Sequence, residues 1–167
     1  TLKPSIAVIN NIELDHTDIY KSVKEIVESF RKFAYSVKPN GYFVTNGDDR
    51  NITKVMKGRI CRRADFGKKA VNEIGMVKTD TEGIKFRLNE IQIELGVIGK
   101  HNVYNAAAAF IAGSIAGIKA SVILKSLASY SGVKRRLELI WNKAYSVYDD
   151  YAHHPTEVSS SLASLNE

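Results

Sequence analysis

The segment from Ser5 to Ile12 reads SIAVINNI, a short apolar run rich in β-branched residues. Runs of this kind are typical of strands that are buried on both faces of a parallel sheet. Apolar residues then recur at helical spacing between Val23 and Val37, and a second strand-like run, YFVT, occupies residues 42–45. A strand, a helix and another strand predict a βαβ unit, and therefore a parallel sheet covered by helices.

The boundaries of this first helix are marked in the sequence. Ser22 and Glu25 have the spacing of a capping box, in which two side chains satisfy backbone N–H groups of the first turn. The Pro-Asn-Gly run at 39–41 predicts the end of the helix, because these residues favour turns. A polar turn at 46–49 and a short helix at 51–57 are expected after the second strand.

The pattern changes between Gly58 and about Gly96. Four segments there alternate apolar with polar residues and are separated by Gly, Asp or Asn. This arrangement predicts antiparallel strands with one face in water. The segments read RICRRADF, NEIGMVKTD, GIKFRLN and IQIELG. The predicted fold class is therefore α/β, a parallel sheet with an added antiparallel β segment.

The last third of the chain predicts two helices, two strands and a final helix. Residues 99–118 read GKHNVYNAAAAFIAGSIAGI and predict a close-packed helix. Ser121 is expected to cap a shorter helix that runs to Tyr130. RRLELIW and AYSVYDDYA then predict strands, and Pro155 is expected at the first position of the final helix, where its missing N–H costs nothing.

The composition is that of a globular protein with a basic surface. The chain has 167 residues, 44% of them hydrophobic and 25% charged, enough for one good core or about one and a half domains. Its net charge of +6 fits a nucleic acid, a phosphate-rich small molecule or simply a solvated lysine-rich surface. The basic residues form no long run, so we predict no nucleic-acid partner.

Other features bound the protein's location and extent. No apolar run approaches the roughly 18 residues of a membrane span, so no membrane partner is predicted. The single cysteine, Cys61, suits a reducing cytoplasm and is expected to fill apolar space. Because the chain begins without Met and ends inside a predicted helix, we expect it to be a piece of a longer polypeptide. The sequence predicts no particular oligomeric state.

Two polar segments lie where ligands bind α/β sheets, next to a strand end or a helix start. In NIELDHTD, at 11–18, His16 and its acidic neighbours could hold Mg²⁺ together with phosphate and water. A helix-capping turn is the alternative interpretation. In GKHNVYN, at 99–105, Asn102 and Asn105 share one helix face and could contact a purine edge or a phosphate, or simply cap the helix.

Two further segments carry charged and titratable groups. In GVKRRLE, at 132–138, the adjacent arginines are expected in a strand, one facing a phosphate and the other an acid. A solvated basic strand is the alternative. In DDYAHHPTE, at 149–157, Asp150 and His153 follow a strand and precede a helix N-terminus, which favours anions. For His154 we favour a helix cap or a surface position.

The order and spacing of these four segments resemble the Mur ligases, ATP-dependent amide-forming enzymes of peptidoglycan synthesis. The resemblance covers nearly the whole chain and is carried by INNIELDHTDIY, GKHNVYNAAAA, SGVKRRLE and DDYAHHPTEV. It implies that residues 1–132 form the later part of a P-loop-type central ATPase domain. Residues 133–167 would begin the Rossmann-like C-terminal domain that binds the incoming amino acid.

The resemblance also implies roles for single residues. His16 would be a ligand of Mg²⁺, and Asn102 and Asn105 would contact the adenine side of ATP. Arg136 would reach the ATP phosphates, and Asp150 would lie on the C-terminal side of the same nucleotide site.

We therefore predict Arg136, Asp150 and His153 as the catalytic side chains, with Tyr151 beside them. Within the family, the paired arginines and DDYAHHPTE resemble the members that join L-alanine to UDP-N-acetylmuramate through an acyl phosphate. Members that attach a recycled murein peptide carry a similar stretch and are the alternative, as is a non-catalytic nucleotide-binding module. Because the family's phosphate loop has no counterpart in these residues, we expect the isolated chain not to turn over.

Overall fold

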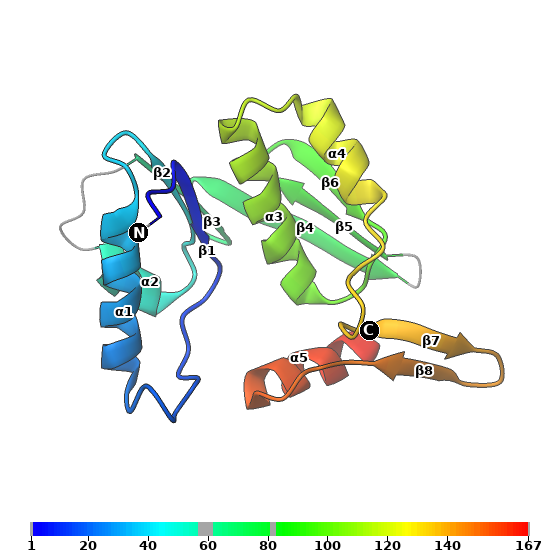
Figure 1. Ribbon diagram of the computed structural model, residues 1–167. Helices are drawn as coiled ribbons and strands as arrows, with labels where there is room; N and C mark the ends of the chain where they lie inside the picture. Colours follow the sequence, from blue (N-terminus) through cyan, green and yellow to red (C-terminus); the bar gives the residue numbers. More distant parts are fainter. Residues whose placement is uncertain (1, 57–61, 81–82, 167) are drawn as a thin grey trace.

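The computed structural model describes residues 2–56, 62–80 and 83–166, so the prediction for Cys61 lies outside the described residues. The described chain folds into one large sheet, one small sheet and five helices around them (Figure 1). In chain order the elements are β1 (Ile6–Ile9), α1 (Val23–Ser36), β2 (Tyr42–Asn46), α2 (Arg50–Met56), β3 (Arg62–Gly67), β4 (Asn72–Asp80), β5 (Gly83–Leu88), β6 (Ile91–Leu95), α3 (Lys100–Ile115), α4 (Ala120–Ala128), β7 (Glu138–Asn142), β8 (Ser146–Asp149) and α5 (Pro155–Leu165).

The large sheet has the order β1-β2-β3-β4-β5-β6. Strands β1, β2 and β3 pair in parallel, whereas β4, β5 and β6 pair antiparallel. The predicted α/β fold with an antiparallel segment is therefore confirmed. The prediction that β3 belongs to the antiparallel group is wrong. Its polar residues, Arg62 and Arg63, are exposed at one end of the strand, while Phe66 and Gly67 are buried at the other, so the alternation did not mark a wet face.

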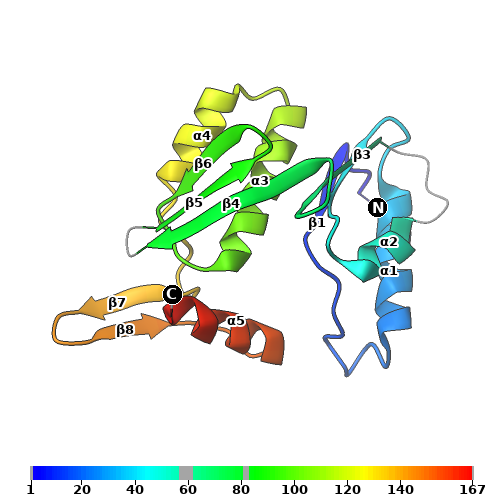
Figure 2. The same cartoon turned by 180° about the vertical axis from the view of Figure 1, so that it is seen from behind.

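Strand β2 is buried on both faces of the sheet. Phe43, Val44 and Thr45 are fully buried, which explains the unbroken apolar character of this strand. Phe43 belongs to a core formed with α1 and α2, and Val44 belongs to a second core that includes α3. Figures 1 and 2 show α1 and α2 on one side of β1–β3 and α3 on the other. The sheet is thus a rigid platform whose strand ends lead into the loops described below.

The helix starts follow the predictions only in part. Ser22 is the N-cap of α1, and its hydroxyl accepts the N–H of Glu25 at 3.4 Å. The Glu25 carboxylate accepts the N–H of Lys21 rather than that of Ser22, at 2.8 Å. The prediction that Ser121 caps α4 is wrong, because the N-cap is Lys119 and it makes no side-chain capping bond.

The C-terminal unit, residues 133–166, consists of the two-stranded sheet β7-β8 and helix α5, which project from one end of the molecule (Figure 1). The two adjacent arginines lie in a turn before β7, so their prediction as strand residues is wrong. Arg135 has a left-handed backbone with φ of 61°, and its N–H donates to the Glu138 carboxylate at 2.8 Å. Among the described helices, none is long and apolar enough to cross a lipid bilayer.

Candidate functional site

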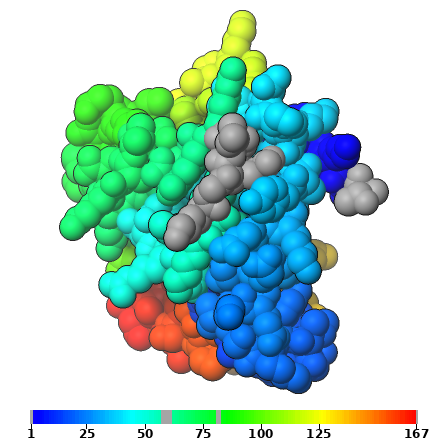
Figure 3. Space-filling model, turned by 90° about the vertical axis from the view of Figure 1, so that its left-hand side faces the viewer, coloured from blue at the N-terminus to red at the C-terminus, as the bar shows by residue number. Residues whose placement is uncertain are grey.

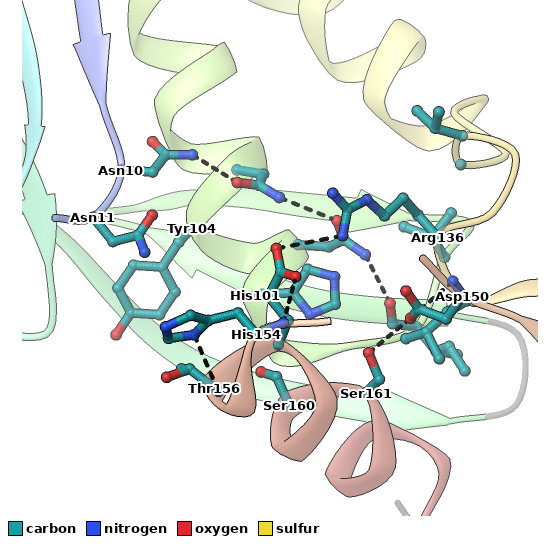
Figure 4. Close-up of a pocket in the computed structure, with 18 of the residues that line it drawn as sticks. Asn10, Asn11, His101, Tyr104, Arg136, Asp150, His154, Thr156, Ser160 and Ser161 are labelled. Carbon is teal, nitrogen blue, oxygen red and sulfur yellow. Dashed lines mark hydrogen bonds and ion pairs between the residues drawn. The ribbon is translucent and has the colours of Figure 1, made fainter. Parts of the chain in front are cut away.

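A cleft of about 1300 Å³ lies between the loop after β1, the start of α3 and the C-terminal unit. Figure 4 shows how side chains from these three places point into it. Figure 3 shows that residues near the N-terminus, in blue, lie beside those near the C-terminus, in red and orange. The cleft therefore joins segments far apart in the sequence. The predicted site residues that line it are His16, Asn102, Asn105, Arg136 and Asp150.

A row of amide side chains forms one wall of the cleft. Asn102 donates to the Ile98 carbonyl at 2.8 Å, Asn105 donates to Asn102 at 3.4 Å, and Asn10 donates to Asn105 at 2.6 Å. Asn102 and Asn105 share a helix face, as predicted. Asn10 was missed, although its place just after the first parallel strand is a signal that could have identified it. The row holds the amides in fixed orientations toward the cleft.

The start of α3 passes close to α5 at Gly99. The backbone of this glycine has φ of 99°, in the left-handed region. A Cβ atom there would lie 2.7 Å from His101 Cε1 and 3.2 Å from Ser164 Oγ, so no larger residue fits without movement. No side chain caps the start of α3, and His101 and Asn102 of its first turn line the cleft. The N-terminus of a helix favours an anion.

Asp150 organises the C-terminal side of the cleft. Its carboxylate accepts hydrogen bonds from the Ser161 hydroxyl at 2.7 Å, the Ala152 N–H at 2.8 Å and the Leu137 N–H at 3.3 Å. Partial desolvation raises its pKa, but these three bonds and the charge of Arg136 outweigh that effect. The pKa of Asp150 therefore lies below its ordinary value of 3.8. The carboxylate is ionised near neutral pH and fixes the turn that carries both arginines.

Both arginines lie near acids. Arg136 Nη1 is 3.5 Å from Glu157 Oε1, and Arg135 Nε is 3.9 Å from Asp149 Oδ2. Arg135 also lies over the Tyr151 ring, 4.7 Å from its centroid. Only Arg136 lines the cleft, and its side chain is 49% exposed. A guanidinium carries five N–H donors, so this long contact to Glu157 does not use up the hydrogen-bonding capacity of Arg136.

His16 lies on an exposed turn at the edge of the cleft. Its backbone has φ of 50°, and its carbonyl accepts the N–H groups of Ile19 and Tyr20. Its ring lies 3.9 Å from Asp15 Oδ2, and the His16 N–H lowers the pKa of the Asp15 carboxyl. Among the residues that the structure describes, no group of three or more His, Cys, Asp or Glu side chains converges on one point. The metal role of His16 stays a prediction.

The two adjacent histidines differ in position. His153 does not line the cleft: its Nδ1 lies 3.0 Å from the Tyr151 carbonyl, and its ring packs edge-on against the Tyr151 ring. His154 does line the cleft and is the N-cap of α5, as expected, with Pro155 at the first helical position. The catalytic role given to His153 stays a prediction, and the structure places it just outside the cleft.

His101 and Tyr104 of α3 also line the cleft but were not predicted, because nothing in the spacing of α3 separates them from ordinary helix residues. Burial around the imidazole lowers the pKa of His101, while Asp150 opposes the shift and Arg136 adds to it. The Tyr104 hydroxyl donates to Asp48 at 2.9 Å. Burial and this bond raise the pKa of Tyr104 to about 12.

Comparisons with known proteins identify the family. Residues 1–113 match the model of the Mur ligase middle domain. The chain belongs to the Mur ligase family. It is 37% identical to the UDP-N-acetylmuramate–L-alanine ligase of Caldicellulosiruptor bescii and 36% identical to that of Streptomyces coelicolor, over 98% and 97% of its length. It spans only 38% and 37% of the length of these relatives.

Solved structures of Mur ligases have the same fold. The chain superimposes on the UDP-N-acetylmuramate–alanine ligase MurC of Thermotoga maritima with a TM-score of 0.81 and 26% identity, over 99% of this chain and 39% of that one. MurF from Acinetobacter baumannii gives a TM-score of 0.86 at 22% identity, over 95% and 36% of the two chains. MurF of Thermotoga maritima, solved in complex with ADP, gives 0.84 at 22% identity, over 98% and 39%. The predicted family and fold class are therefore confirmed.

Proposed function

We propose that this chain is part of an ATP-dependent ligase that joins L-alanine to UDP-N-acetylmuramate in peptidoglycan synthesis, acting in the cytoplasm. The observation that carries the proposal is the cleft, because it brings together residues from distant parts of the sequence. His16 and Asp150 are 134 residues apart (150 − 16 = 134), and Asn102, Asn105 and Arg136 line the same cleft. Residues 1–132 would be the later part of the central ATPase domain, and residues 133–167 the start of the C-terminal domain.

The wall of amides suits the adenine of ATP. Amide side chains pair with the donor and acceptor edge of adenine, and the row from Asn10 through Asn105 to Asn102 holds its members in place. The N–H groups at the start of α3, beside Gly99, favour the negative charge of phosphates. The sheet side of the cleft would therefore bind and orient the nucleotide.

The C-terminal side supplies charge at the phosphates. The Arg136 guanidinium carries several donors and a fixed positive charge, which stabilise the charge on a transferring phosphoryl group. Asp150 holds the Arg136 turn through the Leu137 N–H and keeps it against α5 through Ser161. His153, outside the cleft, would meet the acyl group and the incoming amine when the domains close.

In the described part of the chain, the side chains near His16 do not converge on one point by themselves, so a magnesium ion there would need phosphate oxygens and water as further ligands. The His16 ring and the Asp15 and Glu13 carboxylates lie along one loop of the cleft, and one or two carboxylates with phosphate oxygens and water are the usual ligands of Mg²⁺. When bound, the ion would neutralise charge on the phosphate oxygens. The loop's task would be to present these donors at the cleft edge.

Two alternatives compete with this proposal. Murein peptide ligases from Psychrobacter arcticus and Neisseria meningitides share the fold, with TM-scores of 0.71 and 0.67. A peptide acceptor is therefore the second candidate, and the names of the relatives in Caldicellulosiruptor and Streptomyces favour L-alanine over it. A nucleotide-binding module without catalysis is the third, and it predicts binding of ATP with no phosphate release.

The test is phosphate release by the full-length protein supplied with ATP, Mg²⁺ and UDP-N-acetylmuramate. We expect release to require L-alanine and not to occur with L-alanyl-γ-D-glutamyl-meso-diaminopimelate as the acceptor. Arg136→Ala should lower kcat about 100-fold or more, as for loss of a charge-stabilising donor. Arg135→Ala is the matched control, since Arg135 does not line the cleft. Phosphate release with the peptide would select the peptide ligase. No phosphate release with either acceptor would select the nucleotide-binding module without catalysis.

A further inference from the structure

Two hydrogen bonds cross the cleft between the loop after β1 and the first turn of α5. His154 Nε2 lies 3.1 Å from the carbonyl oxygen of Leu14, and the Thr156 hydroxyl donates to Glu13 Oε2 at 2.7 Å. The partners are about 140 residues apart in sequence. Neither bond is needed to form β1 or α5. They tie one side of the cleft directly to the other.

The geometry fixes which nitrogen of His154 carries the proton. Nδ1 faces the N–H of Thr156 at 3.3 Å and must accept, because an N–H can only donate. Nε2 faces the Leu14 carbonyl and must donate, because a carbonyl oxygen can only accept. The neutral imidazole with its proton on Nε2 satisfies both contacts. The same ring therefore caps α5 with one nitrogen and holds the opposite loop with the other.

The carboxylate of Glu13 accepts hydrogen bonds from two side chains. Glu13 Oε2 accepts from Thr156, and Glu13 Oε1 accepts the side-chain N–H of Asn11 at 3.2 Å. His154 Nδ1 also lies 3.8 Å from Glu13 Oε2. The α5 turn thus fixes two consecutive residues, Glu13 and Leu14, of the loop that continues to His16.

The His16 segment depends on such support. The His16 side chain is 71% exposed, and its nearest charged partner, Asp15, is itself half exposed. Nothing in the contacts of that ring determines where the loop lies over the cleft. Asp49 and Asn51 hold Ile12 on the sheet side. The bonds at Glu13 and Leu14 tie the next two residues to the C-terminal unit.

We propose that His154 and Thr156 form a latch, a pair of positioning residues that holds the His16 loop against the C-terminal unit and so sets the closed form of the cleft. The latch acts through the loop and touches no reacting atom. Its effect on cleft shape is a property of this chain, and its effect on turnover rests on the proposed function.

Two matched double variants separate the latch from simple capping of α5. In His154→Asn with Thr156→Val, the Asn oxygen can still cap the helix, but the shorter side chain cannot reach Leu14 and the hydroxyl is lost. In His154→Gln with Thr156→Ser, the longer amide can donate to Leu14 and the hydroxyl remains, but Gln is a poor N-cap. A latch predicts that the Asn/Val variant is worse, whereas capping alone predicts that the Gln/Ser variant is worse.

The first measurement is the distance between spin labels at Thr17→Cys and Ser159→Cys, both exposed positions, with Cys61→Ser. We expect one narrow distance distribution for the otherwise unchanged chain and for Gln/Ser. We expect Asn/Val to shift the closed-to-open ratio toward open by about 5- to 100-fold, the product of two lost hydrogen bonds. A narrow, unchanged distribution for Asn/Val, or a broad one for Gln/Ser alone, would overturn the latch.

The second measurement is turnover of the full-length protein carrying the same variants. We expect Asn/Val to raise the Mg²⁺ concentration needed for half-maximal rate and to lower kcat more than Gln/Ser does, with similar melting temperatures. Equal effects of the two variants would overturn the positioning role. If the unchanged protein shows no ligation at all, the proposed function fails, while the spin-label distances still decide the latch.

Discussion

The large sheet and the C-terminal unit hold their shapes by different means. In β2, Phe43 and Val44 have no exposed surface, whereas in β7 Leu139 and Trp141 are 47% and 45% exposed. In the described part of the C-terminal unit, the only buried residue is Ser164. The sheet is stabilised by apolar burial, and the C-terminal unit by hydrogen bonds and ion pairs around the cleft. The site is therefore built from one rigid wall and one wall whose position depends on polar contacts.

The largest expected effect lies in the rigid wall. Phe43→Ala removes a fully buried ring from the core between the sheet and α1, and should lower the free energy of unfolding by about 3–5 kcal/mol. Trp141→Ala, in the exposed β7, should cost about 1 kcal/mol or less. Urea unfolding of both variants measures the difference. Similar losses would mean that the two regions are stabilised alike.

Removing one charge from the C-terminal unit should loosen its hydrogen bonds. Asp150→Asn removes the carboxylate that accepts the N–H of Ala152, and leaves an amide N–H₂ facing a donor. We expect exchange of the Ala152 amide hydrogen to accelerate about tenfold, while that of Phe43 in β2 does not change. Asp149→Asn is the matched control, since within the described residues the Asp149 carboxylate makes a long ion pair with Arg135 at 3.9 Å. Slow exchange at Ala152 in the Asp150 variant would contradict this account.

The C-terminal unit and the large sheet should lose their structure at different acid pH values. The pKa values of Asp150 and Glu157 lie below their ordinary values of 3.8 and 4.5, so the folded form binds protons less readily than the unfolded chain. Their stabilisation is present above about pH 4.5 and is lost as the pH falls through the lowered values. Amide exchange followed by NMR should show residues 150–157 losing protection at a higher pH than β2. Loss at one common pH would contradict the prediction.

A smaller effect is expected on the sheet side of the cleft. Tyr104→Phe removes the hydroxyl that donates to Asp48 and should cost about 1 kcal/mol. Because the pKa of Tyr104 is raised to about 12, its contribution is present below about pH 10 and is lost as the pH rises through 12. Spectrophotometric titration of tyrosine should show one group ionising near pH 12, and that group should be missing in the variant. Its persistence would assign the shift to another tyrosine.

The sequence predicted features that depend on local physics. The unbroken apolar run of β2, the cap at Ser22 and Pro155 at the start of α5 each follow from one short segment. The sequence-based prediction that β3 is antiparallel was wrong, because the polar residues of β3 lie at one end of the strand rather than on one face. The prediction for Arg135 was also wrong, because nothing in a paired arginine marks a left-handed turn.

The candidate site was predicted as separate segments, and their meeting was implied only by the family resemblance. His16, Asn102 and Asp150 do line one cleft. The position of Asn10 just after β1 could have identified it, but its bond to Asn105, 95 positions away, could not be predicted. The cross-cleft partners of His154 could not be found either, because they lie about 140 positions away in the sequence. Spacing along one element carries no information about such pairs.

The most direct test of the central claim is hydrogen exchange of the full-length protein with and without Mg²⁺ and a non-hydrolysable ATP analogue. If the two walls build one nucleotide site, the nucleotide should slow exchange in residues 100–105 and in residues 150–157 together. Protection of residues 100–105 alone, with 150–157 unchanged, would contradict the claim that the C-terminal unit completes the site.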